Sequence, residues 1–326
     1  MLLRVLLEIR IQIRTFRNLG GITDLIVSGG GQLDDYWGGA FAHPYTLLKW
    51  ALLARLRGAR VSVVSVGAGP IDSSLSALFI KRTLSLAWYR SYRDDRSAKL
   101  VASLGFDRGD RVYPDLAHSL KITVNGRRPK PDGPQLTIGV GPMAYFEYSW
   151  PERDAGVYRD YLGKLSAFVV WALRQGHSIR LFPGEAGADK DVISDLKAMV
   201  QERMGPIEET RLISPRIETV DELLRELKHA DVVVASRFHG VLLAHLMGVP
   251  VVALSYHQKI DVLMRDMGHA HYCLNIRTFT ESELLGRFAK MTSVLPEERD
   301  RVVATEHQYR ARLDEQYDHL FSTLQS

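Results

Sequence analysis

The sequence has 326 residues, 46% of them hydrophobic, with a formal net charge of +4 and a single cysteine, Cys273. This length and apolar content can bury a substantial core in two domains, and one cysteine excludes an intrachain disulfide, as is typical of a reducing cytosol. The charge balance lacks the basic excess of a nucleic-acid-binding protein, so we expect no nucleic acid partner.

The first segment, residues 2–19, places apolar side chains at helical spacing with arginines on its other faces. Its charges interrupt the apolar run that a signal peptide needs, and no segment reaches the roughly 18 uninterrupted apolar residues of a membrane span. We expect a helix packed on a sheet, in a cytoplasmic protein. The alternative is a weakly membrane-associated helix, which would make the protein peripheral at the inner face of the membrane.

Strands then alternate with helices, the pattern of parallel sheets with right-handed crossovers. In the first half, the sequence predicts strands at 24–28, 60–66, 90–93 and 111–113 and helices at 44–57, 73–88 and 95–104. In the second half, it predicts strands at 136–140, 178–182, 211–213, 231–235 and 251–254, with helices at 155–175, 189–203, 219–229, 240–247 and 258–267.

Glycine, proline and charged residues make the segment from Asn125 to Gln135 the clearest linker. We therefore expect an N-terminal domain over 1–128 and a second domain over 135–300. The charged tail, 301–326, is expected to form a helix that leans back on the first domain. This pattern alone predicts two α/β units.

The most informative stretch runs from a strand ending at Ala235 into a loop with Ser236, Arg237 and His239, followed by an apolar helix. Ligands of parallel α/β sheets bind beyond the carboxyl ends of the strands, often at helix N-termini. Arg237 can hold a phosphate or carboxylate through two hydrogen bonds, and His239, with an unperturbed pKa of about 6.5, can donate a proton near neutral pH. The pair suits an anion that must be protonated. In the alternative interpretation, Arg237 pairs with a surface carboxylate and His239 merely begins a helix.

The motif Ser-Arg-Phe-His-Gly at 236–240, with Gly-Val-Pro at 248–250 and then Tyr256 and Lys259, resembles the polysaccharide pyruvyl transferase family. Three further segments fit this resemblance: Ser-Gly-Gly-Gly-Gln-Leu at 28–33, Val-Gly-Ala-Gly-Pro at 66–70 and Ser-Tyr-Arg-Asp-Asp-Arg-Ser at 91–97. The resemblance covers most of the chain, and the Arg237/His239 segment is its specific part.

The resemblance implies an α/β fold of two Rossmann-like domains facing a cleft, the glycosyltransferase-B-type architecture. The first domain would bind the acceptor and the second the donor. Family members usually begin with a strand, a loop containing glycine and asparagine, and a helix. This sequence begins inside that helix, so we expect a first domain shortened at its N-terminus.

The family's reaction transfers a pyruvyl group from phosphoenolpyruvate to two hydroxyls of a sugar in a cell-surface polysaccharide or its precursor, forming a ketal. The expected partners are phosphoenolpyruvate and a sugar or lipid-linked glycan acceptor. We expect no cofactor, with phosphoenolpyruvate as the donor substrate. NAD in particular is not expected, because the glycine runs lack the G-x-G-x-x-G spacing of dinucleotide binding. We also expect no metal, because the histidines have no ligand-like spacing with the cysteine or with acids.

Arg237 and His239 are the expected catalytic residues, and ten others are candidates for substrate binding. Arg93 could bind an anion or pair with Asp94 or Asp95, and glycines 29–31 could let a ligand approach the backbone or form a tight turn. Beyond these, the candidates are Ser236 and Gly240 in the motif. Gly184 and Glu185 after the strand 178–182, and Tyr256 and Lys259, are also candidates, and each of these four could instead be structural. The full set of binding candidates is Arg93, Gly29, Gly30, Gly31, Ser236, Gly240, Gly184, Glu185, Tyr256 and Lys259.

Three acidic residues carry separate expectations. Glu147 is a candidate base for the sugar hydroxyl. Asp189 and Asp191 open a helix, where acids are favoured by the helix dipole, so we expect them to serve helix capping.

Other functions remain as alternatives at this stage. A glycosyltransferase with a nucleotide-sugar donor would share the fold, but gives no reason for an Arg-x-His pair. A degenerate, non-catalytic family member would agree with the shortened start and disagree with the intact pair. A nucleic-acid-binding module would need a basic stripe, which the sequence lacks.

Overall fold

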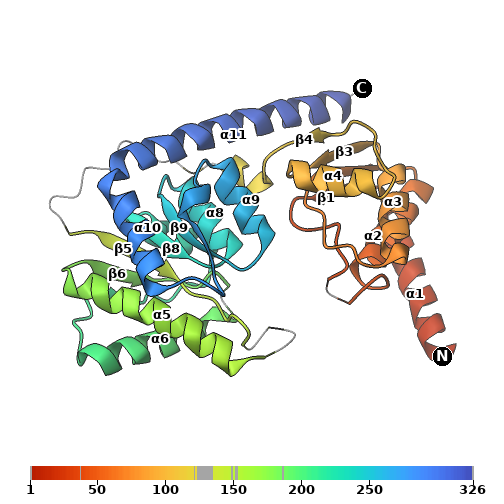
Figure 1. Cartoon of the computed structure of the whole chain (residues 1–326). Coiled ribbons are helices and arrows are strands. Elements are labelled where there is room, and N and C mark those ends of the chain that lie inside the picture. Colours follow the sequence, from red (N-terminus) through yellow and green to blue (C-terminus); the bar gives the residue numbers. More distant parts are fainter. Residues whose placement is uncertain are drawn as a thin grey trace. The chain divides into compact units, whose positions relative to one another are not determined.

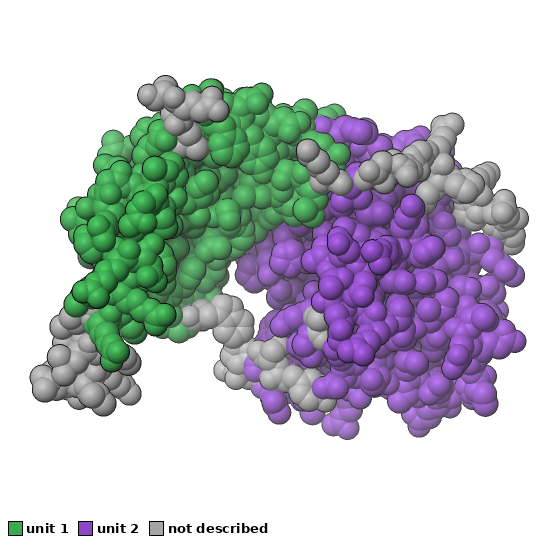
Figure 2. Space-filling view, turned by 180° about the vertical axis from the view of Figure 1, so that it is seen from behind, with its two compact units in different colours: residues 1–120, 308–326 green, residues 121–307 purple. Residues whose placement is uncertain are grey.

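The computed structural model describes residues 2–36, 38–120, 122, 135–147, 150, 153–185 and 187–324. The chain divides into two compact units, which we call unit 1 (residues 1–120 and 308–326) and unit 2 (residues 121–307) (Figure 2). The first predicted domain boundary was at 128, whereas the division between the units falls at 120. The linker predicted over 125–135 lies outside the described residues, apart from Gln135.

Unit 1 contains a four-stranded parallel sheet whose strands lie side by side in chain order. The strands are β1 (Asp24–Ser28), β2 (Arg60–Val66), β3 (Tyr89–Tyr92) and β4 (Arg111–Val112). The helices are α1 (Leu2–Asn18), α2 (His43–Leu56), α3 (Ser74–Leu86) and α4 (Asp95–Ser103), with a 3-10 helix, η1 (Leu116–Ser119). The valines of β2 form the centre of the core, because this inner strand has neighbours on both sides.

The first helix, α1, packs on α2 rather than standing alone. Lys49 of α2 forms an ion pair with Glu8 at 2.9 Å, and Arg57, just after α2, lies over the ring of Phe16. Leu19, directly after α1, is buried in the core of unit 1. The expected helix is therefore present, and the contacts described for it are with α2. Among the described residues, no helix has both the length and the apolar content needed to cross a bilayer.

Unit 2 contains a six-stranded parallel sheet with the strand order β10-β9-β8-β5-β6-β7. Figure 1 labels its strands β9, β8, β5 and β6. Its strands are β5 (Thr137–Gly141), β6 (Ser178–Leu181), β7 (Leu212–Ile213), β8 (Val232–Ala235), β9 (Val251–Ser255) and β10 (Cys273–Asn275). The chain builds outward from β5 to β7, returns to the other side of β5 with β8, and continues to β10. Between β5 and β8 the sheet therefore has a topological switch point, where open α/β sheets bind ligands.

Helices connect these strands in two groups. They are α5 (Ala155–Arg174), α6 (Asp189–Met204), α7 (Val220–Leu227), α8 (Phe238–Leu246), α9 (Gln258–Asp266) and α10 (Glu281–Ser293), with a 3-10 helix, η2 (Ala270–Tyr272). Helix α5 contacts α6 and α10, and α8 contacts α7 and α9, as expected for two helix layers around a parallel sheet.

The last helix, α11 (Leu295–Leu324), contributes to both units. Within unit 2, Arg299 forms an ion pair with Asp231 at 2.6 Å. Within unit 1, the buried side chain of Gln316 donates to Ser91 Oγ at 2.6 Å and accepts from Ser65 Oγ at 3.0 Å. The helix begins at Leu295, several residues before the predicted tail.

Apart from the last helix, the predicted strands and helices are present within about three residues of their expected bounds. The ends of helices and strands are less well determined by sequence than the elements themselves. The sequence reasoning missed β10 and α10. Strand β10 has three residues, too few for a pattern. Helix α10 begins with a capping box of Thr280 and Glu283, a signal that could have located it.

Candidate functional site

The strongest candidate site lies at the topological switch point of unit 2. The loop after β5 and the loop after β8 flank this point, because β5 and β8 are hydrogen-bonded neighbours. Arg237 is the last residue before α8, with an extended backbone that ends the strand and lets the helix begin at Phe238. The structure thus places the predicted Arg237 and His239 together at a helix start beside the switch point.

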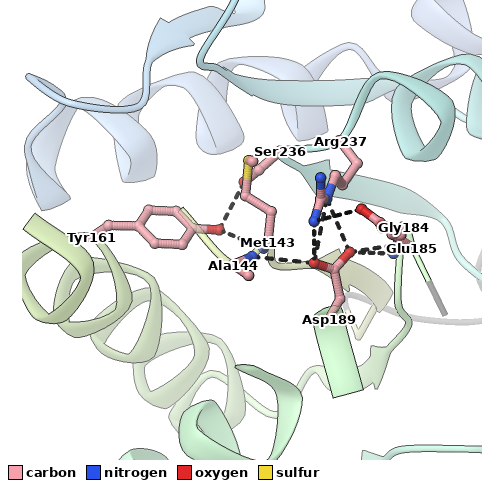
Figure 3. A network of polar contacts seen from close by, with 8 residues as sticks. All are labelled: Met143, Ala144, Tyr161, Gly184, Glu185, Asp189, Ser236 and Arg237. Carbon is pink, nitrogen blue, oxygen red and sulfur yellow. Dashed lines mark hydrogen bonds and ion pairs between the residues drawn. The ribbon is translucent and has the colours of Figure 1, made fainter. Parts of the chain in front are cut away.

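The side chain of Arg237 is 15% exposed and is held by two carboxylates (Figure 3). Its Nη2 lies 2.8 Å from Asp189 Oδ1 and its Nε lies 3.1 Å from Asp189 Oδ2. Glu185, whose side chain is 54% exposed, lies 3.0 Å from Nη2. Burial lowers the pKa of Arg237, but hydrogen bonds and the charge of Asp189 outweigh it and raise the pKa, so the group stays cationic.

Asp189 is the centre of this arrangement, and its side chain is fully buried. Besides Arg237, its carboxylate accepts backbone N–H groups from Ala144 at 3.1 Å, Gly184 at 3.1 Å and Glu185 at 2.8 Å. A buried carboxylate requires such pairing. The prediction that Asp189 serves helix capping is therefore wrong, because its partners lie before the helix and on neighbouring loops. Asp191 in the same turn is exposed.

Gly184 allows Arg237 to reach Asp189. A Cβ on Gly184 would lie 2.5 Å from the Cβ of Arg237 and would also overlap its Cγ. Any larger residue would therefore displace the Arg237 side chain. The sequence left Gly184 as either a ligand contact or a structural residue, and the structure gives it this packing role.

A second buried contact joins the loop after β5 to the loop after β8. The Ser236 hydroxyl lies 2.8 Å from the Tyr161 hydroxyl, which in turn accepts the N–H of Met143 at 3.2 Å (Figure 3). Burial raises the pKa of Tyr161 well above its usual value, so the phenol stays protonated. Ser236 and Gly240 are themselves buried, and Gly240 packs against the ring of Phe182. Tyr161 was not selected from the sequence, because nothing in its local pattern indicated the contact.

His239 is the second residue of α8 and is exposed, with its ring 5.4 Å from that of Phe238. Lys259 Nζ lies 5.7 Å from the Phe238 ring and 5.4 Å from the Tyr256 ring. The structure therefore gathers the two predicted residues from the start of α9 and the end of β9 beside the Arg237–His239 segment. Arginine, lysine and a helix N-terminus together favour an anionic ligand.

The remaining candidates belong to unit 1. Gly29 and Gly30 have positive φ values of 54° and 66°, a conformation that glycine adopts without strain. Gly30 accepts the N–H of Gly67 at 2.7 Å, and a Cβ on Gly67 would lie 2.6 Å from Arg93 Nη2. The structure therefore brings Arg93 next to the glycine loop. Gly31 follows in the same turn.

Arg93 also forms ion pairs at 3.5 Å with Asp94 and with Asp115. The alternative of a pairing with Asp94 is thus confirmed. Asp115 was missed, because it lies 22 residues further along the chain. Only its position after β4, at the same end of the sheet as Arg93, could have suggested the contact.

In the part of the chain that the structure describes, no group of three or more histidine, cysteine, aspartate or glutamate side chains is arranged to hold a metal ion.

Comparisons with known proteins agree with this architecture. The family model for polysaccharide pyruvyl transferase matches residues 4–258. None of the curated proteins matches the chain. Among solved structures, a protein assigned as a UDP-N-acetylglucosamine 2-epimerase from Listeria monocytogenes is similar at 14% identity with a TM-score of 0.60, covering 96% of this chain and 80% of that one.

Two further solved structures have the same fold. The UDP-GlcNAc 2-epimerase from Neisseria meningitidis, bound to UDP-GlcNAc, is 10% identical with a TM-score of 0.56, over 96% of this chain and 81% of that one. A UDP-forming trehalose-phosphate synthase from Burkholderia vietnamiensis is 10% identical with a TM-score of 0.52, over 86% and 74%. These likenesses confirm an α/β fold of the glycosyltransferase-B type with parallel sheets.

Proposed function

Because the chain belongs to the polysaccharide pyruvyl transferase family, we propose that it transfers a pyruvyl group from phosphoenolpyruvate to two hydroxyls of a sugar, forming a ketal. The acceptor would be a cell-surface polysaccharide or its precursor, including a lipid-linked glycan. The observation that carries this proposal is the placement of Arg237 by Asp189 at the switch point, with His239 two residues away. No cofactor is required in this reaction.

Phosphoenolpyruvate has a carboxylate and a phosphate, and Arg237 supports the binding of either. Asp189 contacts Nε and Nη2, which fixes the plane of the guanidinium and leaves other N–H groups for a ligand. Glu185 occupies a position beside Nη2 from the solvent side. An anionic donor would displace this exposed carboxylate, while the buried Asp189 stays in place. Lys259 and the N–H groups at the start of α8 would add favourable charge.

The proposed reaction begins with a proton transfer from the His239 imidazolium to the methylene carbon of the donor. The adjacent carbon, which bears the phosphate, then becomes electrophilic and bonds to the first sugar hydroxyl oxygen. The second hydroxyl oxygen then bonds to this carbon, while the bond between the carbon and the bridging phosphate oxygen breaks. One hydroxyl proton returns to His239 and the other leaves with the phosphate, so that the products are the ketal and inorganic phosphate.

A nucleotide-sugar glycosyltransferase is the second candidate, and the likeness in fold to enzymes of UDP-sugars favours it. It would use the same switch point for a nucleoside diphosphate. It gives no role to a proton donor beside Arg237, so we rank it below pyruvyl transfer.

We also propose that the reaction takes place in the cytoplasm, where phosphoenolpyruvate is formed and where a single reduced cysteine is common. In the case of a lipid-linked acceptor, the protein would act at the inner face of the membrane.

The proposal is tested by incubating the full chain with phosphoenolpyruvate and a panel of methyl pyranosides in D₂O. We expect release of inorganic phosphate that depends on a pyranoside, and a product whose methyl group contains one deuterium. His239→Asn should slow the release by about 100-fold or more, since a general acid contributes on that scale, while donor binding persists. Sugar transfer from UDP-sugars without turnover of phosphoenolpyruvate would instead support the glycosyltransferase.

A further inference from the structure

Three half-buried aromatic rings lie in contact beside the candidate site of unit 2, and we call them the aromatic row: Phe146, Trp150 and Tyr256. The rings of Phe146 and Trp150 are stacked with centroids 5.4 Å apart, and those of Trp150 and Tyr256 meet edge to face at 5.6 Å. Phe146 and Trp150 come from the loop after β5, and Tyr256 directly follows β9. The row therefore spans loops on both sides of the switch point.

The loop that contains Phe146 is fixed by the same carboxylate that holds Arg237. Asp189 accepts the N–H of Ala144, and the carbonyl of Phe146 accepts the N–H of Asp154 at 3.0 Å. Phe146 has a φ of 55°, which is unfavourable for a bulky side chain and persists only where the surroundings impose it. The fold thus holds this ring in place at a conformational cost.

The row lies where the core meets the surface. Tyr145, whose ring contacts those of Phe146 and Trp150, is buried and packs on Tyr161. The three rings of the row remain partly open to solvent although they contact one another. Partly open aromatic rings beside polar groups are typical of a ligand-binding surface.

Polar and charged groups surround the row. The exposed Arg277 lies over the ring of Phe146 at 5.6 Å, and Lys259 lies beside Tyr256. Glu147 belongs to the same loop and is half-buried. Such a surface has apolar faces for C–H groups and flanking charges for hydroxyl groups.

Phosphoenolpyruvate does not match this surface, because it is a small molecule without a ring that carries a carboxylate and a phosphate. A pyranose ring can, because one face of the sugar presents C–H groups to aromatic rings while its hydroxyls bind arginine and carboxylate side chains. We infer that the aromatic row is the acceptor surface of unit 2, on which a pyranose ring of the acceptor packs next to the donor at Arg237. This inference rests on the proposed function, and it gives unit 2 a part in acceptor binding that was expected of the first domain alone.

The test measures sugar binding and donor binding separately in the full chain. The sugar probes are methyl β-galactopyranoside, methyl β-glucopyranoside and methyl α-mannopyranoside. Their binding is detected by saturation-transfer NMR and measured by titration, with uridine as a competitor. Phosphoenolpyruvate binding is followed by calorimetry. The variants are Trp150→Ala, the conservative Trp150→Phe, and Trp88→Ala as a control at a tryptophan of unit 1 that is 41% exposed.

We expect at least one pyranoside to bind the wild-type protein. The Trp150→Ala variant should bind this pyranoside about fivefold more weakly or worse, the loss expected for one aromatic contact. The Trp150→Phe variant should retain most of the affinity. Trp88→Ala should bind the sugar as the wild type does. Phosphoenolpyruvate affinity should stay unchanged in all three variants, which also shows that unit 2 remains folded.

Two results would overturn the inference: no pyranoside binds the wild type, or one binds equally well to Trp150→Ala. Binding of uridine that is lost in Trp150→Ala would also overturn it and assign the row to a nucleoside. If phosphoenolpyruvate fails to bind while a pyranoside binds through Trp150, the proposed function fails and the sugar surface stands. The two claims therefore fail separately.

Discussion

Arg237 and Asp189 form an ion pair, whose shortest contacts are 2.8 and 3.1 Å, between the loop after β8 and the first residue of α6. The carboxylate is fully buried and also accepts three backbone N–H groups from the loops after β5 and β6. Arg237 is thus oriented before any substrate arrives. Such preorganisation reduces the conformational cost of binding an anion.

Replacing Asp189 should affect both stability and the site. Asp189→Asn removes the charge that balances Arg237, and breaking a buried pair costs about 3 kcal/mol in the free energy of unfolding. Chemical denaturation measures this loss, and calorimetry should show weaker phosphoenolpyruvate binding. Asp191→Asn, an exposed acid in the same turn, is the matched control and should change neither quantity. Equal effects of the two substitutions would contradict the role of Asp189.

Gly184→Ala should disturb Arg237 through packing alone. The new methyl group would overlap the Arg237 side chain, so the guanidinium must move away from Asp189. We expect donor affinity to fall by about tenfold, the loss of one charged hydrogen bond. Gly187→Ala is the control on the same loop, because a Cβ there meets nothing within 4 Å. A Gly184→Ala variant with wild-type donor affinity would show that the position of Arg237 does not matter.

Removing the charge of Glu185 should strengthen donor binding. Its exposed carboxylate contacts Arg237 Nη2 at 3.0 Å, where an anionic substrate would compete with it. We expect Glu185→Gln to tighten phosphoenolpyruvate binding by about threefold to tenfold, the scale of a partly exposed ion pair. Glu218→Gln, which alters another exposed acid paired with an arginine, serves as the control. Weaker binding in Glu185→Gln would mean that Glu185 contacts the donor itself.

Stability should fall as the pH is lowered below neutrality. Burial lowers the pKa of His269, an effect that the nearby Glu298 only partly offsets. Below the unfolded value of about 6.5, the unfolded chain therefore binds a proton that folded His269 does not, and the free energy of unfolding decreases. His269→Gln should flatten the fall in denaturation midpoint between about pH 7 and pH 5.5. His307→Gln, an exposed histidine of α11, should follow the wild-type curve. If the denaturation midpoint of His269→Gln falls with pH as steeply as that of the wild type, His269 is not the cause of the fall.

The sequence was sufficient for the local part of the site. A buried strand, a short loop and an apolar helix predict where Arg237 and His239 lie, because ligands gather at the carboxyl ends of parallel strands. The partner of Arg237 could not be predicted in the same way. Asp189 lies 48 residues away, and its contact exists because the loops after β5, β6 and β8 meet at the switch point.

The contacts of Arg93 in unit 1 could not be predicted from the sequence for the same reason. Arg93 and the glycine at 30 were both selected from the sequence, but the residue between them, Gly67, was seen only as the end of a strand. The order of strands in a sheet decides which loops meet, and spacing along the chain does not determine that order. Buried polar partners such as Tyr161 are hidden for the same reason.

The most direct test is calorimetric titration of the full chain with phosphoenolpyruvate, in the wild type, Arg237→Ala and Arg265→Ala, the last an exposed arginine of α9. We predict that the wild type and Arg265→Ala bind phosphoenolpyruvate with equal affinity. Arg237→Ala should bind at least about tenfold more weakly. Equal binding by Arg237→Ala, or binding of uridine diphosphate in place of phosphoenolpyruvate, would contradict a donor site at Arg237.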